Sequence, residues 1–219
     1  MSTVNIAIDG PAGAGKSTIA RMVSAEMGYI YVDTGAMYRA VALYITENNI
    51  DDASIENELK NADISLKFVD GSQRVFLGDR DVSELIRTPE ISMAASRTSA
   101  VPAVRAYLFE LQKKIARENN VIMDGRDIGT VVLPDADVKI FLTAAAEERA
   151  SRRYKELAVK PDHPAYEEIL EDIIQRDYQD MNRETAPLKQ ADDAVLVDTT
   201  KLTLEQSAEA ITKIIKERI

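Results

Sequence analysis

Apolar and polar residues follow two patterns that alternate along the chain, one typical of strands and the other typical of helices. Short apolar runs between turn signals predict buried strands at 4–8, 29–32, 121–124, 138–142 and 194–197. Apolar residues spaced three or four apart predict helices at 17–27, 35–48, 104–118, 147–157, 166–181 and 204–215. Because strands and helices alternate, we expect an α/β fold in which helices cover both faces of a parallel sheet.

One segment, residues 63–90, breaks this alternation of strand and helix. Apolar and polar residues alternate at 64–68 and again at 75–77, and Asp70-Gly71 supplies a turn signal between them. Two alternating runs around a turn are typical of a β-hairpin. We therefore expect a small antiparallel β insertion in this segment.

The rest of the chain divides into a core and a lid. The predicted core of this single-domain protein comprises residues 1–62, 91–146 and 182–219. The two helices predicted within 147–181 are rich in charge and are joined by a Pro-containing loop at 158–164. This helical pair is the best candidate for a moving lid.

Composition narrows the function classes. The chain has 219 residues, no cysteine and a formal net charge of -10. The absence of cysteine excludes disulfides and thiolate metal sites. The acidic balance argues against a broad nucleic-acid surface, although a local arginine cluster can still bind one phosphate because distant charges are screened within about 8 Å. No signal peptide and no membrane span are evident, so we expect a cytoplasmic protein with no membrane partner.

The first predicted strand leads into a glycine-rich loop. Gly10-Pro11-Ala12-Gly13-Ala14-Gly15-Lys16-Ser17 matches the pattern G-x-x-x-x-G-K-[ST] and is followed by Thr18. In such a loop, backbone N–H groups and a helix N-terminus surround the phosphates of a nucleotide. Lys16 is expected to reach the β- and γ-phosphates, and the Ser17 hydroxyl to bind Mg²⁺. The alternative is a glycine-rich turn capped by Ser17.

A nucleotide site alone leaves several classes of protein open. A GTPase carries N-K-x-D or T-K-x-D to recognise guanine, and neither occurs here. The L-S-G-G-Q signature of transporter ATPases is also missing, and the chain is too short to add the output domain of a motor. A small-molecule kinase remains, with a nucleotide-binding regulatory module as the rival.

Two further strands end in polar residues, where an open parallel sheet binds its ligands. After one strand come Thr34, whose alternative role is a helix N-cap, and Arg39, which otherwise pairs with a surface carboxylate. After the other, Asp124 occupies the place of a Walker B aspartate and is expected to hold Mg²⁺, unless it caps a helix or pairs with Arg126. The alternative for Arg126 and Asp127 is a surface ion pair.

These motifs occur together and in order. Asp9–Ser17, Asp33-Thr34-Gly35-Ala36-Met37-Tyr38-Arg39, Asp124-Gly125-Arg126-Asp127-Ile128-Gly129-Thr130 and Arg176-Asp177-Tyr178-Gln179-Asp180-Met181-Asn182-Arg183 resemble the bacterial cytidylate kinase family over essentially the whole chain. The resemblance implies a P-loop kinase that transfers a phosphoryl group from ATP to CMP or dCMP with Mg²⁺, in pyrimidine nucleotide metabolism. It also favours a monomer. Another monophosphate or small-metabolite kinase is the alternative among enzymes.

The resemblance also assigns roles to individual residues. It places Thr34, Arg39 and Arg126 around the acceptor phosphate, and Ser96, Arg105 and Asp127 at the cytosine edge. It places Arg176, Asp180 and Arg183 near the acceptor sugar and phosphate, and Arg149, Arg152 and Arg153 in the lid, closing over the phosphoryl group in transit. Lys16, Arg126 and the three lid arginines are thus the predicted catalytic residues. For the lid arginines, the alternative is a solvated helix face paired with Glu147 and Glu148.

Overall fold

A five-stranded parallel sheet forms the centre of the molecule. The computed structural model describes residues 3–69, 72–159 and 163–219. The strands are β1 (Asn5–Asp9), β2 (Ile30–Asp33), β6 (Val121–Gly125), β7 (Val138–Thr143) and β8 (Val195–Asp198), in the order β2-β6-β1-β7-β8. Every neighbouring pair is parallel, which confirms the predicted α/β fold.

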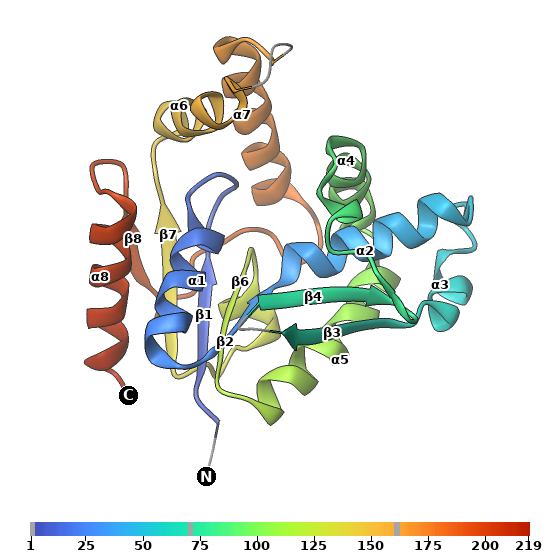
Figure 1. The fold of residues 1–219 in the computed structure, drawn as a ribbon, viewed down its shortest axis with the longest axis horizontal. Helices are drawn as coiled ribbons and strands as arrows, with labels where there is room; N and C mark the ends of the chain where they lie inside the picture. The colour runs from blue at the N-terminus through green and yellow to red at the C-terminus, as the bar shows by residue number, and fades with distance from the viewer. Residues whose placement is uncertain (1–2, 70–71, 160–162) are drawn as a thin grey trace.

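Helices cover both faces of this sheet (Figure 1). Helices α1 (Lys16–Met27) and α8 (Leu204–Lys216) pack on one face, and α2 (Thr34–Glu47) and α5 (Pro102–Glu118) pack on the other. Because side chains alternate along a strand, Ile6 and Ile8 join the core under α1 and α8, whereas Ala7 joins the core under α2 and α5. This double burial explains why the strands read as continuous apolar runs.

The β insertion is a three-stranded antiparallel sheet. Strands β3 (Ile64–Val69) and β4 (Ser72–Leu77) form the predicted hairpin, and the short strand β5 (Arg80–Asp81) pairs with β4. The predicted turn at Asp70-Gly71 lies outside the described residues.

Several short elements have weak sequence signals and were not predicted. They are α3 (Ile55–Glu58), the 3₁₀ turns η1 (Leu59–Asn61) and η2 (Leu85–Arg87), helix α4 (Pro89–Thr98) and the single π-helical turn η3 (Ile128–Val132). Helix α4 begins with a side-chain cap from Thr88 and buries only Ile91, Ala94 and Ala95, so its apolar face is small. Of these short elements, α4 contributes residues to the lining of the cleft described below.

Helices α6 (Ala146–Leu157) and α7 (Tyr166–Asn182) lie beyond the carboxyl ends of the strands, at the top of Figure 1. They share a small apolar core of their own, centred on Ala150, Ile169 and Ile173. That separate core is what a rigid lid would need, although lid motion itself stays a prediction. Among the helices that the structure describes, none has the length and hydrophobicity required to cross a membrane.

Candidate active site

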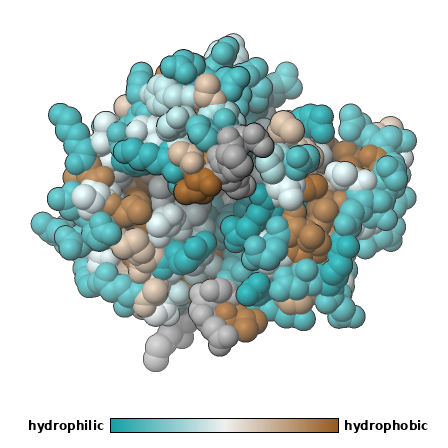
Figure 2. Space-filling view, turned by 45° about the horizontal axis from the view of Figure 1, so that its top comes forward, coloured by the Kyte–Doolittle hydropathy of each residue, from teal (hydrophilic) through white to brown (hydrophobic). Residues whose placement is uncertain are grey.

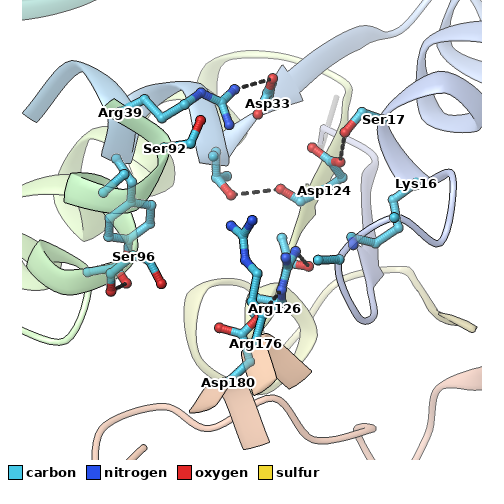
Figure 3. A pocket seen from close by; sticks show the side chains of 18 of the residues that line it. Lys16, Ser17, Asp33, Arg39, Ser92, Ser96, Asp124, Arg126, Arg176 and Asp180 are labelled. Carbon is cyan, nitrogen blue, oxygen red and sulfur yellow. Dashed lines mark hydrogen bonds and ion pairs between the residues drawn. The ribbon is translucent and has the colours of Figure 1, made fainter. Parts of the chain in front are cut away.

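A polar cleft of about 380 Å³ opens at the carboxyl ends of β1, β2 and β6. The loop between β1 and α1 lines one side, α4 and α5 line another, and α7 contributes from above. Figure 3 shows Arg126 and Arg176 extending into the middle of the cleft, with Lys16 and Asp124 on one side and Ser92 and Ser96 on the other. The face turned forward in Figure 2 is mostly hydrophilic, with apolar side chains in separate patches.

Most of the predicted site residues meet in this one cleft. The predicted residues that line it are Ala12, Gly13, Ala14, Gly15, Lys16, Ser17, Thr18, Thr34, Arg39, Ser96, Arg105, Asp124, Arg126, Asp127, Arg176, Asp180 and Arg183. The structure therefore brings together segments that lie more than 160 residues apart. Their contacts with substrate stay predictions.

The glycine-rich loop has the conformation that phosphate binding requires. Gly13 and Gly15 have φ of 73° and 87°, which a residue with a side chain rarely adopts. Lys16 follows at the start of α1, and its Nζ donates to the carbonyls of Gly10 (2.8 Å) and Pro11 (2.7 Å). Burial, reinforced by nearby Arg126, lowers the pKa of Lys16 to about 7. An anionic ligand in the loop would offset both effects.

Two oxygen-bearing side chains meet where a metal ion is predicted. The Ser17 hydroxyl donates to Asp124 Oδ2 at 2.7 Å, and the Tyr31 hydroxyl donates to Asp124 Oδ1 at 3.2 Å. Burial, with Asp33 nearby, raises the pKa of Asp124 to about 6. A hydroxyl and a carboxylate side by side suit Mg²⁺, which takes oxygen ligands and is usually shared with substrate phosphates. No cluster of three or more acidic or histidine ligands occurs within the described residues, so the protein alone offers no complete metal cage.

Carboxylates hold the arginines on the opposite side of the cleft. Arg126 Nε donates to Asp180 at 2.7 Å. Asp127 accepts from Arg105 and, at 3.3 Å, from Arg183. The alternative that Arg126 and Asp127 pair with each other is therefore wrong, as is the alternative that Arg126 pairs with Asp124.

Arg176 differs from its neighbours. Within the described residues, no carboxylate forms an ion pair with it. Burial, followed by repulsion from Arg126, lowers its pKa. A buried cation among other cations creates a strong preference for an anion at this position.

Thr34, Arg39 and Ser96 line the side of the cleft that lies away from the glycine-rich loop. The Thr34 hydroxyl donates to the carbonyl of Asp124 at 2.7 Å, so it joins the start of α2 to β6. Thr34 does not cap helix α2, because Asp33 accepts from the Ala36 N–H at 2.8 Å and is the N-cap. Arg39 pairs with that same Asp33 at 3.2 Å. Ser96 lies on α4 and faces the cleft.

The three lid arginines separate into two groups. Arg149 is buried, donates to the carbonyl of Ala12 in the phosphate loop at 2.9 Å, and makes a double hydrogen bond with Asp177. Arg152 pairs with Glu148 and with the carbonyl of Thr199, outside the lining of the cleft.

Arg153 is exposed and pairs with Glu156 at 3.1 Å. Glu156, to which we gave no role, does line the cleft. In this conformation only Arg149 of the three lid arginines contacts the loop, and the roles of Arg152 and Arg153 depend on closure of the lid.

The sequence did not identify the residues whose side chains bond to backbone groups of the site. Asp9 accepts two N–H groups in the loop after β6, and Gln73 of the insertion bonds both backbone groups of Asp33. Tyr31 lies in the strand predicted at 29–32, and its hydroxyl also contacts Asp124. An aspartate directly before a helix is an N-cap signal that identifies Asp33. No comparable pattern identifies Gln73.

The fold and the cleft define the class: P-loop proteins in which a surface rich in arginine lies opposite the glycine-rich loop. A family model named cytidylate kinase matches residues 6–217. The chain therefore belongs to the cytidylate kinase family, as the resemblance of its motifs predicted.

Individual relatives agree with this membership. The chain is 51% identical over 215 residues to the cytidylate kinase of Carboxydothermus hydrogenoformans, covering 97% of each chain. It is 53% identical over 209 residues to that of Caldicellulosiruptor bescii, covering 94% of this chain and 92% of the relative. A crystal structure of an uncharacterized protein from Eubacterium ventriosum aligns over 99% of both chains with a TM-score of 0.57 at 12% identity, which shows a shared fold alone.

Proposed function

We propose that the protein is a nucleoside monophosphate kinase that transfers the γ-phosphoryl group of ATP to CMP and dCMP. The observation that carries the proposal is one cleft in which a glycine-rich loop faces a cluster of arginines. The glycine-rich loop with Lys16 lies on one side, and Arg126, Arg176 and Arg183 lie on the other. A protein that only senses ATP has no use for the second site. Membership of the cytidylate kinase family supplies the class of acceptor.

The chemistry needs placement of charge rather than a base. The second pKa of a phosphate ester is about 6, so the acceptor is mostly dianionic at neutral pH. One of its oxygens bonds to the γ-phosphorus while the bond from that phosphorus to the β-bridging oxygen breaks, giving CDP and ADP. Guanidinium groups and Lys16 bring the two anions together and stabilise the charge on the group in transit.

We infer that carboxylates of the cleft hold the arginines in position until substrate arrives. Asp180 holds Arg126, and Asp127 holds Arg105 and Arg183. We expect the acceptor phosphate to replace Asp180 at Arg126, because a dianion competes well for a bidentate guanidinium.

At the base end, we expect Asp127 to accept from the exocyclic amine of cytosine and Arg105 to donate to the ring carbonyl. Uracil lacks that amine, so the Asp127 carboxylate would be left without its donor and UMP would bind poorly.

Mg²⁺ fits the site as a partner of ATP. Ser17 and Asp124 would hold it, and when bound it neutralises charge on the β- and γ-phosphates. Two protein ligands and several open positions match the usual mode of Mg²⁺ binding. We expect EDTA to abolish turnover and added Mg²⁺ to restore it.

Closure of the α6–α7 pair would keep water from the γ-phosphate. Arg149 already bridges the pair to the phosphate loop through Ala12. Arg152 and Arg153 would approach only if the pair moves, so hydrolysis of ATP stays slow until both substrates are bound.

A coupled assay for ADP tests the proposal directly. Purified protein, ATP and Mg²⁺ are combined in turn with CMP, dCMP, UMP, AMP and shikimate. We expect kcat/KM for CMP to exceed that for UMP and AMP by at least about 100-fold. Faster turnover of AMP, UMP or shikimate would contradict the assignment of the acceptor, and no turnover of any acceptor would contradict the proposed activity.

A further inference from the structure

Asp9 is a buried carboxylate outside the lining of the cleft. It ends strand β1 directly before Gly10 of the phosphate loop, and only 4% of its surface is exposed. Its Oδ1 accepts from the N–H of Ile128 at 2.8 Å, and its Oδ2 accepts from the N–H of Gly129 at 2.7 Å. Those two residues begin η3, immediately after Arg126 and Asp127.

The N–H groups at the start of η3 need an acceptor from elsewhere in the fold. The first N–H groups of any helical turn have no partner within it, and the N-cap residue Asp127 provides no side-chain cap. The Asp127 carboxylate is instead directed to Arg105 and Arg183. Asp9 thus replaces the local cap and leaves Asp127 free to face the cleft.

The loop between β6 and η3 is tightly packed, so its backbone has little freedom to move independently of Asp9. A Cβ at Gly125 would lie 2.6 Å from Ile128 Cδ1, and a Cβ at Gly129 would lie 3.2 Å from Lys139 Cδ and 3.4 Å from Asp9 Oδ2. Bonds from N–H groups to a carboxylate are also shorter and stronger than neutral ones. A shift of the Asp9 carboxylate would therefore shift the backbone that carries Arg126 and Asp127.

We propose that Asp9 is a positioning residue for phosphoryl transfer, which fixes the loop carrying Arg126 and Asp127 relative to the phosphate loop. The proposal rests on the function proposed above. One side chain thereby joins the donor side of the cleft to the acceptor side. A displacement of about 1 Å between reacting groups costs roughly 100-fold in rate, so such a connection matters to catalysis.

The electrostatics of Asp9 support this role. Burial raises its pKa to about 6 even though the two N–H groups lower it. The ionised form present at neutral pH is therefore retained at a cost to folding stability. Only the carboxylate supplies two acceptors in one plane for two adjacent N–H groups.

The variant Asp9→Asn tests the proposal with little change in size. Its amide has one acceptor, and its NH₂ group faces the second backbone N–H. We expect kcat with CMP to fall roughly 10- to 100-fold, KM for ATP to change less than about threefold, and the preference for CMP over UMP to narrow. Asp137→Asn is the matched control, because Asp137 accepts the Asn5 N–H at the opposite end of β1 at 2.8 Å. It should retain wild-type kinetics.

Three results would overturn the proposal. One is a kcat for Asp9→Asn within about threefold of wild type. Another is an equal loss of kcat in Ile211→Val, a core variant in α8, when the two proteins have matched melting temperatures. The third needs no variant to fold: rapid hydrogen exchange at the Ile128 and Gly129 amides of the wild type. Wild-type protein that fails to phosphorylate CMP would refute the proposed function instead, so the two failures are distinguishable.

Discussion

At the residue scale, the cleft is a set of cations held apart by carboxylates. Asp33, Asp127 and Asp180 each pair with at least one arginine of the acceptor side, so the arginines stay in place without a ligand. Among the arginines that line the cleft, Arg176 alone has no ion-pair partner within the described residues. This arrangement explains how a chain of net charge -10 can bind two anions: the positive charge is local and already oriented.

Selectivity should depend on Asp127. In Asp127→Asn the side chain gains a donor that can meet the carbonyl of uracil, so we expect the ratio of kcat/KM for CMP over UMP to fall at least tenfold. The coupled assay with both nucleotides measures this ratio. Asp81→Asn, an exposed carboxylate of the insertion that contacts Arg74 at 3.8 Å, serves as the control. An unchanged ratio would place base recognition elsewhere.

Asp9 should also leave a signature in the pH dependence of stability. Its pKa is 3.8 ordinarily and about 6 in the folded protein, so the folded state binds more protons between these values and stability rises as pH falls. Asp127, which raises this pKa, and Lys16, which lowers it, face the same group.

From pH 7 to pH 4.5, the free energy of unfolding of wild type should increase by on the order of 2 kcal/mol relative to Asp9→Asn. Urea titrations of both proteins at several pH values give this difference. The contributions of groups present in both proteins, such as Asp124, cancel when the two free energies of unfolding are subtracted. A difference that is flat or of opposite sign would contradict the raised pKa.

At the scale of elements, the β insertion reaches the site through one side chain. Gln73 on β4 accepts from the Asp33 N–H at 2.9 Å and donates to the Asp33 carbonyl at 3.2 Å, so its amide continues the hydrogen bonding of the edge strand β2. Asp33 in turn caps α2 and pairs with Arg39. The β insertion therefore helps to hold Asp33 and Arg39 on the side of the cleft where the acceptor is predicted to bind.

Removing that connection should weaken acceptor binding selectively. Gln73→Leu loses two hydrogen bonds of about 1 kcal/mol each, so we expect KM for CMP to rise roughly 5- to 30-fold while KM for ATP stays unchanged. Steady-state kinetics with each substrate varied in turn provide both constants. Arg74→Gln, at the adjacent and exposed position, is the control. Equal rises in both KM values would indicate a general loss of structure.

At the scale of the whole molecule, the sequence was sufficient for the parts of the fold that have strong periodicity. The apolar runs that became β1, β6 and β7 are buried on both faces and are therefore unambiguous. Helix α4 was missed because it is ten residues long and buries mainly alanine. The π-helical turn η3 depends on Asp9, which lies 119 residues away from Ile128, and no local pattern predicts it.

The candidate site likewise contains residues that local motifs predict and contacts that they do not predict. Lys16 and Ser17 follow from the spacing of one motif, and Asp124 follows from its place at the end of an apolar strand, where an open parallel sheet binds its ligands. The pairing of Arg126 with Asp180, rather than with its neighbour Asp127, depends on the position of α7 beyond the carboxyl ends of the strands. Such long-range pairs are set by tertiary packing, which residue spacing does not contain.

The most direct test of the central claim is a crystal structure with CMP and a non-hydrolysable ATP analogue bound. We predict triphosphate oxygens in the loop at 10–17 and the CMP phosphate against Arg126 and Arg176, with Asp180 displaced from Arg126. We expect the cytosine between Ser96, Arg105 and Asp127. A CMP molecule bound outside this cleft, or bound with its base against the phosphate loop, would contradict the account.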